Sequence, residues 1–518
     1  MAAESKLVLV PSGELVRTTR TASTCSGTTS SHMLSDSTTS APAASASLEV
    51  RPQPPRVMGF ADLVLFYVVT GVSLRWIATA AASGPSSIVI WIGALLCFYT
   101  PLALAVIELS SRHPQEGGLY VWSQRAFGDF SGYMAGWAYW TSNLPYFPAV
   151  LYFAASNALY IRQGHWSRLS NNANFYIWFS ILALLLITAM NVVGLNIGKW
   201  LHNVGALGMW LPAMIVMVMG FYAWHRFGAA TSFTRSSLIP GSHLKDMVFW
   251  ATLAFAFAGC ETGSLIAGEI KNSRRTIPRA LLVAGVIVAF CYIMGTVCVL
   301  LAVPSAEVND LQGLMQAISR TAGKLGWFAI IPISAALIAI SNLGAAGAYL
   351  ASVARLPFVA GIDRFLPPAF GKLHPRWHTP HVALIVQLIC AVLFVFLAQA
   401  GTSVKGAYDV LVSMSIITYF IPYLYVFAAL FKLQREKAGP EIIRVPGGAP
   451  VAKVVSCVGF TTTMFTILIS VVPSPQETNK VLAVIKVVGL SGALVGAGAL
   501  LYYAGKKRKQ QLATAIIP

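Results

Sequence analysis

The stretch FAFAGCETGSLIAGEI, residues 255–270, lies in one of the most apolar regions of the chain, yet it carries a carboxylate, Glu261, near its middle. Three glycines surround this carboxylate: Gly259, Gly263 and Gly268. A charged side chain costs about 2.5–3.5 kcal/mol at the centre of a membrane-spanning helix, and glycine weakens a helix. We therefore expect this segment to be interrupted, and to face protein or water rather than lipid.

The composition indicates a polytopic helical membrane protein. The 518 residues are 56% hydrophobic and only 10% charged, whereas soluble domains are about 25% charged. Apolar windows long enough to cross a hydrocarbon layer of about 30 Å as a helix recur along the chain. We predict twelve spans, at about 60–80, 87–109, 129–160, 174–196, 202–222, 246–269, 278–302, 326–353, 380–400, 408–431, 452–472 and 480–503.

The net charge of +18 is explained by membrane topology. With twelve spans and a cytoplasmic N-terminus, most of the 36 Lys and Arg residues fall in cytoplasmic segments, as the positive-inside rule requires. We therefore expect both termini in the cytoplasm and, since no targeting address is recognisable, the plasma membrane as the location. The sequence contains no basic domain with interspersed aromatic residues, so nucleic-acid binding is not expected. The seven scattered cysteines suggest neither disulfides nor a metal site, and we expect no cofactor.

The spans and the polar segments between them predict the domain organisation. The N-terminal segment before the first span is rich in Ser, Thr, Ala and Pro, which is typical of disorder. The predicted parts are a disordered cytoplasmic tail (1–57), a ten-helix core (58–431) with two repeats (about 58–222 and 243–431), a cytoplasmic loop (432–451), helices eleven and twelve (452–503), and a basic cytoplasmic tail (504–518). Because no soluble domain interrupts the spans, any activity must lie between the helices.

A second interruption is expected in the first span, where Thr70, Gly71 and Ser73 are followed by a charged residue, Arg75. A broken helix survives in a membrane only where it faces protein or a water-filled cavity. Interruptions at corresponding positions of two halves indicate a transporter binding site. The first and sixth spans are five apart, so the spacing predicts two inverted five-helix repeats, with two further helices after them.

The broken helices suggest the chemistry of a ligand. Free N–H groups at a half-helix N-terminus suit a carboxylate, and free C=O groups suit an ammonium. A zwitterionic amino acid uses both. Glu261 has three possible roles: it binds a substrate cation, it takes up a proton, or it forms an internal ion pair with Arg75.

Three further side chains are candidates for the same site. Arg75 either contacts a substrate carboxylate or only pairs with Glu261. Phe255 lies just before the sixth-span break, where an aromatic ring either covers a substrate or packs against its neighbours. Asn143, in the third span, either lines the cavity or bonds to another helix.

Four ordered motifs make residues 58–505 resemble the amino acid–polyamine–organocation superfamily of permeases. They are FAFAGCETGSLIAGEIKNSRRTIPRA (255–280), similar to its sixth-helix signature, RHPQEGGLYVWSQRAFG (112–128), RLPFVAGIDRFLPPAF (355–370) and RVPGG (444–448).

The resemblance implies the five-plus-five inverted-repeat fold of the leucine transporter, and alternating access to a site at the membrane midplane. By motif position, Gly71, Val72 and Ser73 would face the substrate carboxylate. Phe255 would match the gating aromatic, Ala258 and Gly259 would meet the ammonium, and Glu261 would match a proton-linked acid. One departure is TGVSLRW (70–76), which lacks a family glycine and carries Arg75. This arginine would favour an acidic substrate or neutralise Glu261.

The leading hypothesis is a secondary active transporter of amino acids, coupled to protons or working by exchange. A polyamine or other organocation carrier is the alternative that Glu261 favours and Arg75 disfavours. A membrane sensor of the same fold that does not transport is a third class. An enzyme is not expected, because the sequence has no clustered His, Cys or Asp for metal or nucleophilic chemistry.

Overall fold

The structure is a computed structural model of the 518-residue chain. It describes residues 5–9, 15–19, 56, 58–115, 117–162, 165–193, 195–241, 244–309, 311–359, 365–377, 379–437, 439–473, 477 and 479–516. Residues 1–52 and 53–518 form two separate units.

The first unit contains a short hairpin in a segment where the sequence analysis expected disorder. Strand β1 (Ser5–Leu9) pairs antiparallel with β2 (Leu15–Thr19), with Val8 opposite Val16. Leu and Val are frequent in these ten residues, and β-branched side chains favour strands. The rest of the predicted tail, apart from residue 56, lies outside the described residues.

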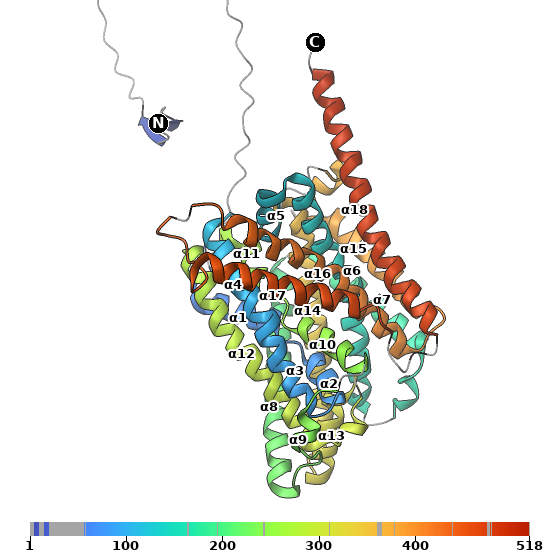
Figure 1. The fold of residues 1–518 in the computed structure, drawn as a ribbon. Helices are drawn as coiled ribbons and strands as arrows, with labels where there is room; N and C mark the ends of the chain where they lie inside the picture. Colours follow the sequence, from blue (N-terminus) through green and yellow to red (C-terminus); the bar gives the residue numbers. More distant parts are fainter. Residues whose placement is uncertain are drawn as a thin grey trace, which may run out of the picture. The chain divides into compact units, whose positions relative to one another are not determined.

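The second unit is built of helices joined by short loops (Figure 1). In chain order they are α1 (Phe60–Gly71), α2 (Leu74–Ala82), α3 (Ser86–Ala94), α4 (Thr100–Arg112), α5 (Leu119–Phe127), α6 (Asp129–Ala158), α7 (Ala173–Val193), α8 (Leu195–Phe227), α9 (Arg235–Leu238), α10 (Leu244–Ala256), α11 (Thr262–Leu265), α12 (Ser273–Ala302), α13 (Gly313–Leu325), α14 (Ile330–Val359), α15 (His381–Gln399), α16 (Val404–Leu433), α17 (Gly448–Ile469) and α18 (Lys480–Ile516).

The predicted spans coincide with these helices. In the described part of the chain, nine helical segments are long and apolar enough to cross a membrane, and the bent pair α1–α2 makes ten. One of the nine, Ser86–Arg112, joins α3 and α4 through a π-helical turn at Leu95–Tyr99. The other two predicted spans are α6 and the broken pair α10–α11. The second unit is therefore an all-α, multi-pass membrane protein, as predicted.

Helix α6 lies at the centre of the packing. It contacts α14, α15 and α16, and nearly all of its 30 residues are buried. Because it faces protein on most sides, it carries polar and aromatic residues that a lipid-facing span would not. Helix α1 packs on α12, and α2 packs on both α12 and α13. Helices α12 and α13 therefore flank the first span.

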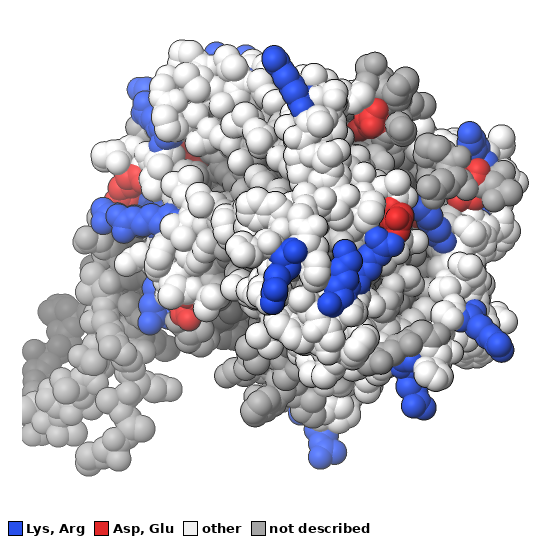
Figure 2. All heavy atoms as spheres, turned by 90° about the horizontal axis from the view of Figure 1, so that it is seen from below, with Lys and Arg blue, Asp and Glu red and all other residues white. Residues whose placement is uncertain are grey.

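Surface charge is dispersed on the face that Figure 2 shows, which is the lower end of the molecule in Figure 1. Lys and Arg side chains lie apart from one another among uncharged residues, with a few Asp and Glu between them (Figure 2). No continuous basic surface is visible there, so this face has no electrostatic footprint for nucleic acid.

Candidate functional site

The first span breaks where the sequence predicts it. Helix α1 ends at Gly71 and α2 begins at Leu74, with Val72 and Ser73 extended between them. The two helices are bent by 43° at this break. The amide of Val72 still donates to the carbonyl of Val68 at 2.9 Å, and this bond closes α1.

The sixth span breaks between Ala256, the last residue of α10, and Thr262, the first residue of α11. Gly259 has φ +114°, which is accessible to glycine but strained for residues with a Cβ. The glycine is thus required by the backbone at this point. The sequence analysis expected a break at Gly259, and the structure has one there.

Tyr292, from α12, satisfies backbone groups at both breaks. Its hydroxyl lies 2.6 Å from the carbonyl oxygen of Gly71 and 3.2 Å from that of Ala256, and it accepts a bond from the amide of Ser73 at 3.0 Å. Its ring stacks on Trp91, with centroids 4.6 Å apart. One phenol therefore connects the two broken spans.

Two further tyrosines bond to backbone groups beside the breaks. Tyr349, from α14, donates to the carbonyl of Thr70 at 2.8 Å. Tyr423, from α16, accepts from the amide of Gly259 at 3.1 Å. Unpaired backbone groups are costly in hydrocarbon, so these hydroxyls stabilise the irregular backbone.

Glu261 is fully buried among phenols. Its two carboxylate oxygens accept hydrogen bonds from Tyr419 at 2.8 Å and from Tyr423 at 2.7 Å. The hydroxyl of Tyr419 lies 3.2 Å from that of Tyr139, on α6. The sequence analysis missed these tyrosines. The sequence feature that could have indicated them is the spacing of Tyr419 and Tyr423, which stand four residues apart and so share one face of a helix.

Arg75 is also buried, with 2% of its surface exposed, but it has no anionic partner among the residues that the structure describes. Its guanidinium carbon lies 4.0 Å from the ring centroid of Trp76 and 5.0 Å from that of Tyr146. Its Nε and Nη1 atoms have no hydrogen-bond partner among the described residues. The ion pair with Glu261 that the sequence analysis left open is not formed, because phenols already hold that carboxylate.

Phe255 contacts an aromatic neighbour of each charged side chain. Its ring meets Trp76 and Tyr419 edge to face, each at a centroid distance of 5.6 Å. Trp76 is the ring on which Arg75 lies, and Tyr419 binds Glu261. Phe255 thus belongs to the aromatic cluster that contacts both charges.

A small cavity joins some of the predicted residues. It has a volume of about 20 Å³, and Gly71, Ala258 and Gly259 lie in its wall, so it holds about one water molecule. Asn143 does not line this cavity. It is buried and donates to the carbonyl of Tyr139 in its own helix at 2.9 Å.

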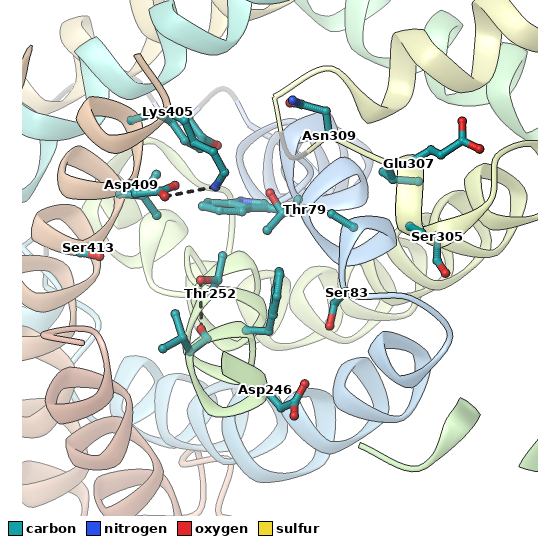
Figure 3. Close-up of a pocket in the computed structure, with 18 of the residues that line it drawn as sticks. Thr79, Ser83, Asp246, Thr252, Ser305, Glu307, Asn309, Lys405, Asp409 and Ser413 are labelled. Atoms are coloured by element: carbon teal, nitrogen blue, oxygen red, sulfur yellow. Dashed lines mark hydrogen bonds and ion pairs between the residues drawn. The ribbon is translucent and has the colours of Figure 1, made fainter. Parts of the chain in front are cut away.

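A cavity of about 560 Å³, which we call the vestibule, lies between α2, α10, residues 305–309 and α16 (Figure 3). Figure 3 shows Lys405 and Asp409 facing each other across its wall, and their charged atoms are 3.2 Å apart. Asp246 and Asn309 also line it, and Trp76 reaches it from the first turn of α2. The vestibule thus extends as far as the ring that covers Arg75.

Near the C-terminus of α4 lies a buried carboxylate that the sequence analysis did not single out. Glu108, in α4, accepts from Arg112 at 2.7 and 2.9 Å and from Gln434 at 2.7 Å. Its second oxygen accepts from the amide of Val445 at 2.8 Å. This network fastens α4 to the loop between α16 and α17.

A family model described as amino acid permease matches residues 58–493. The chain belongs to this family. The match covers both helix breaks and extends into α18.

The curated relatives include transporters, two of which are named for different substrates. An uncharacterized transporter of Legionella pneumophila is 26% identical over 81% of this chain and 90% of its own length. The probable agmatine/putrescine antiporter AguD of Lactococcus lactis is 23% identical, over 76% of this chain and 84% of its own length. The serine/threonine exchanger SteT of Bacillus subtilis is 25% identical, over 72% of this chain and 81% of its own length.

A crystal structure of MhsT in complex with L-phenylalanine has a similar fold. It superimposes with a TM-score of 0.56 at 11% identity and covers 79% of this chain and 97% of that one. The predicted leucine-transporter-like fold is thereby confirmed.

Proposed function

We propose that this permease is a secondary active transporter that moves amino acids by alternating access, coupled to protons or working by exchange. The observation that carries the proposal is Glu261, a fully buried carboxylate placed at the break of the sixth span and bonded by Tyr419 and Tyr423. An ionisable side chain at this depth is costly unless it serves a substrate or a proton.

The two breaks suit the two ends of an amino acid. Gly71, the last residue of α1, and the extended residues Val72 and Ser73 precede the N-terminus of α2, where a carboxylate is favoured by the helix dipole. In the sixth span, the carbonyl of Ala258 accepts no hydrogen bond from the described residues and is available to an ammonium, next to Gly259. The hydroxyls of the site tyrosines can each exchange a backbone partner for a ligand.

The cavities fit one state of an alternating-access cycle. The vestibule reaches Trp76, and Phe255 packs behind that ring. The bonds of Glu108 fasten α4 to Gln434 and Val445. We propose that both termini are cytoplasmic, in the plasma membrane, so that the vestibule opens outward. Movement of Phe255 and Trp76 would then connect it to Glu261.

A polyamine carrier is the second candidate. Two observations favour it: the similarity to AguD, which is named as a probable agmatine/putrescine antiporter, and the presence of the buried acid Glu261, which suits a cation.

The test is uptake by proteoliposomes of radiolabelled amino acids and polyamines, with and without a proton gradient. We expect an amino acid to accumulate in a gradient- or exchange-dependent manner. Glu261→Gln should flatten the pH dependence of uptake, because the amide and the carboxyl group have the same shape but only the carboxyl group takes up and releases a proton. Glu441→Gln, at an exposed carboxylate that pairs with Arg274, is the matched control and should keep the wild-type profile.

Two outcomes contradict the proposal. If no labelled compound accumulates under any gradient or counter-substrate, the transport function is rejected. If Glu261→Gln retains the full rate and the wild-type pH profile, proton coupling through this carboxylate is rejected.

A further inference from the structure

Three cationic side chains are buried in the described part of the chain. Two of them have partners: one pairs with a carboxylate, and one donates to backbone carbonyls. Arg112 pairs with Glu108 at 2.7 Å. Lys486 donates to the carbonyl of Ala398 at 2.7 Å and to that of Ala400, so it caps the end of α15. Arg75 is the third, and neither an acid nor a carbonyl of the described residues compensates it.

An uncompensated buried charge is unfavourable, because the protein interior replaces little of the lost hydration. The rings of Trp76 and Tyr146 lie over the guanidinium, and cation–π attraction offsets part of that cost. The rings offer no acceptor for the N–H groups of Arg75, however, and its Nε and Nη1 remain unpaired. This site therefore favours an anion, whose oxygens can accept hydrogen bonds from these unpaired N–H groups.

The position of Arg75 points to a substrate rather than to a structural anion. It is the second residue of α2, directly after the break at Val72 and Ser73. The N-terminus of α2 adds a partial positive charge at the same place. Trp76, the ring that covers Arg75, lines the vestibule, so the cation lies at the inner end of the entry path.

Charge balance decides between the two substrate classes. Arg75 and Glu261 are both buried and do not pair with each other. An amino acid brings a carboxylate for Arg75 and an ammonium for the region of Glu261. A polyamine brings only cations, which would leave Arg75 unpaired and add repulsion.

We propose that Arg75 recognises the substrate carboxylate, and that it restricts this permease to amino acids by excluding amines that lack a carboxylate. The proposal rests on the transport function proposed above and names the substrate class of that same site.

The test compares amino acids with the amines that remain when the carboxylate is removed: L-arginine with agmatine, L-ornithine with putrescine, and L-phenylalanine with phenethylamine. In wild-type proteoliposomes, at least one amino acid should be taken up about 10- to 100-fold more efficiently than its amine, as for one charge-assisted contact. Arg75→Met should lower uptake of that amino acid and bring the two compounds within about threefold. Arg75→Lys should be intermediate, because it keeps the charge but loses the planar fork.

Lys486→Met is the matched control, because it removes a buried cation that caps a helix. It should destabilise the protein and leave the discrimination unchanged. Size-exclusion profiles of all variants, with direct binding of the same compounds, separate misfolding from lost recognition.

The outcomes distinguish this proposal from the transport proposal. Transport of amine and amino acid at equal efficiency by the wild type, or unchanged discrimination in Arg75→Met, overturns the role of Arg75 while transport stands. If nothing is transported, the transport proposal fails, and amino acid binding that survives Arg75→Met overturns this one as well. If removal of chloride lowers amino acid uptake by the wild type as much as Arg75→Met does but leaves the discrimination unchanged, the anion is chloride and the proposal is wrong.

Discussion

Replacing Tyr292 with Phe should destabilise the protein while keeping its ring in place. The hydroxyl donates to the carbonyl of Gly71 or of Ala256 and accepts from the amide of Ser73. Phe retains the stacking on Trp91 but leaves one buried acceptor and one buried donor unpaired. Each such group costs about 1–3 kcal/mol, so the expected loss from the two groups is about 2–6 kcal/mol in the free energy of unfolding.

Reversible unfolding in mixed micelles measures this loss. The control is Tyr133→Phe, because Tyr133 is equally buried but its hydroxyl has no hydrogen-bond partner among the described residues. That variant should be as stable as the wild type or slightly more stable. If Tyr292→Phe loses less than about 1 kcal/mol, or no more than Tyr133→Phe, then the phenol does not hold the two breaks together.

Two further predictions concern packing and pH. A Cβ on Gly220 would lie 2.6 Å from the Cβ of Cys298, so Gly220→Ala should force α8 and α12 apart and cost about 1–3 kcal/mol of unfolding free energy. Gly323→Ala, where a Cβ meets nothing within 4 Å in α13, should be neutral or stabilising; equal effects of the two changes would refute this reasoning. Burial lowers the pKa of His113 below 6.5, against an opposing effect of Glu436. Because the unfolded chain then binds the proton more tightly, the contribution of His113 to stability is present above about pH 6.5 and is lost as pH falls toward the folded-state pKa. His113→Gln should remove this component from the unfolding free energy measured between pH 5 and 8, and an unchanged pH profile would contradict it.

The breaks themselves were predictable, because they follow from local backbone chemistry. Gly259 adopts a positive φ that L-residues rarely adopt, and the polar residues around Gly71 stand within an apolar span. The buried charges Glu261 and Arg75 were likewise visible as exceptions to the composition of their spans. Their partners were not visible, because a carboxylate in a helix carries no sign of whether an arginine or a phenol will face it.

The sequence by itself determined the number and order of the spans, the positions of the two breaks and the charges placed beside them, because hydrophobic length and glycine conformation act over a few residues. Only the tertiary structure decided that Tyr292, Tyr349 and Tyr423 close the breaks, and that Arg75 and Glu261 remain apart. Those bonds join residues more than 150 positions apart in the chain. Such pairs are selected by the packing of whole helices, since an unpaired polar group in hydrocarbon takes whichever partner the fold brings to it.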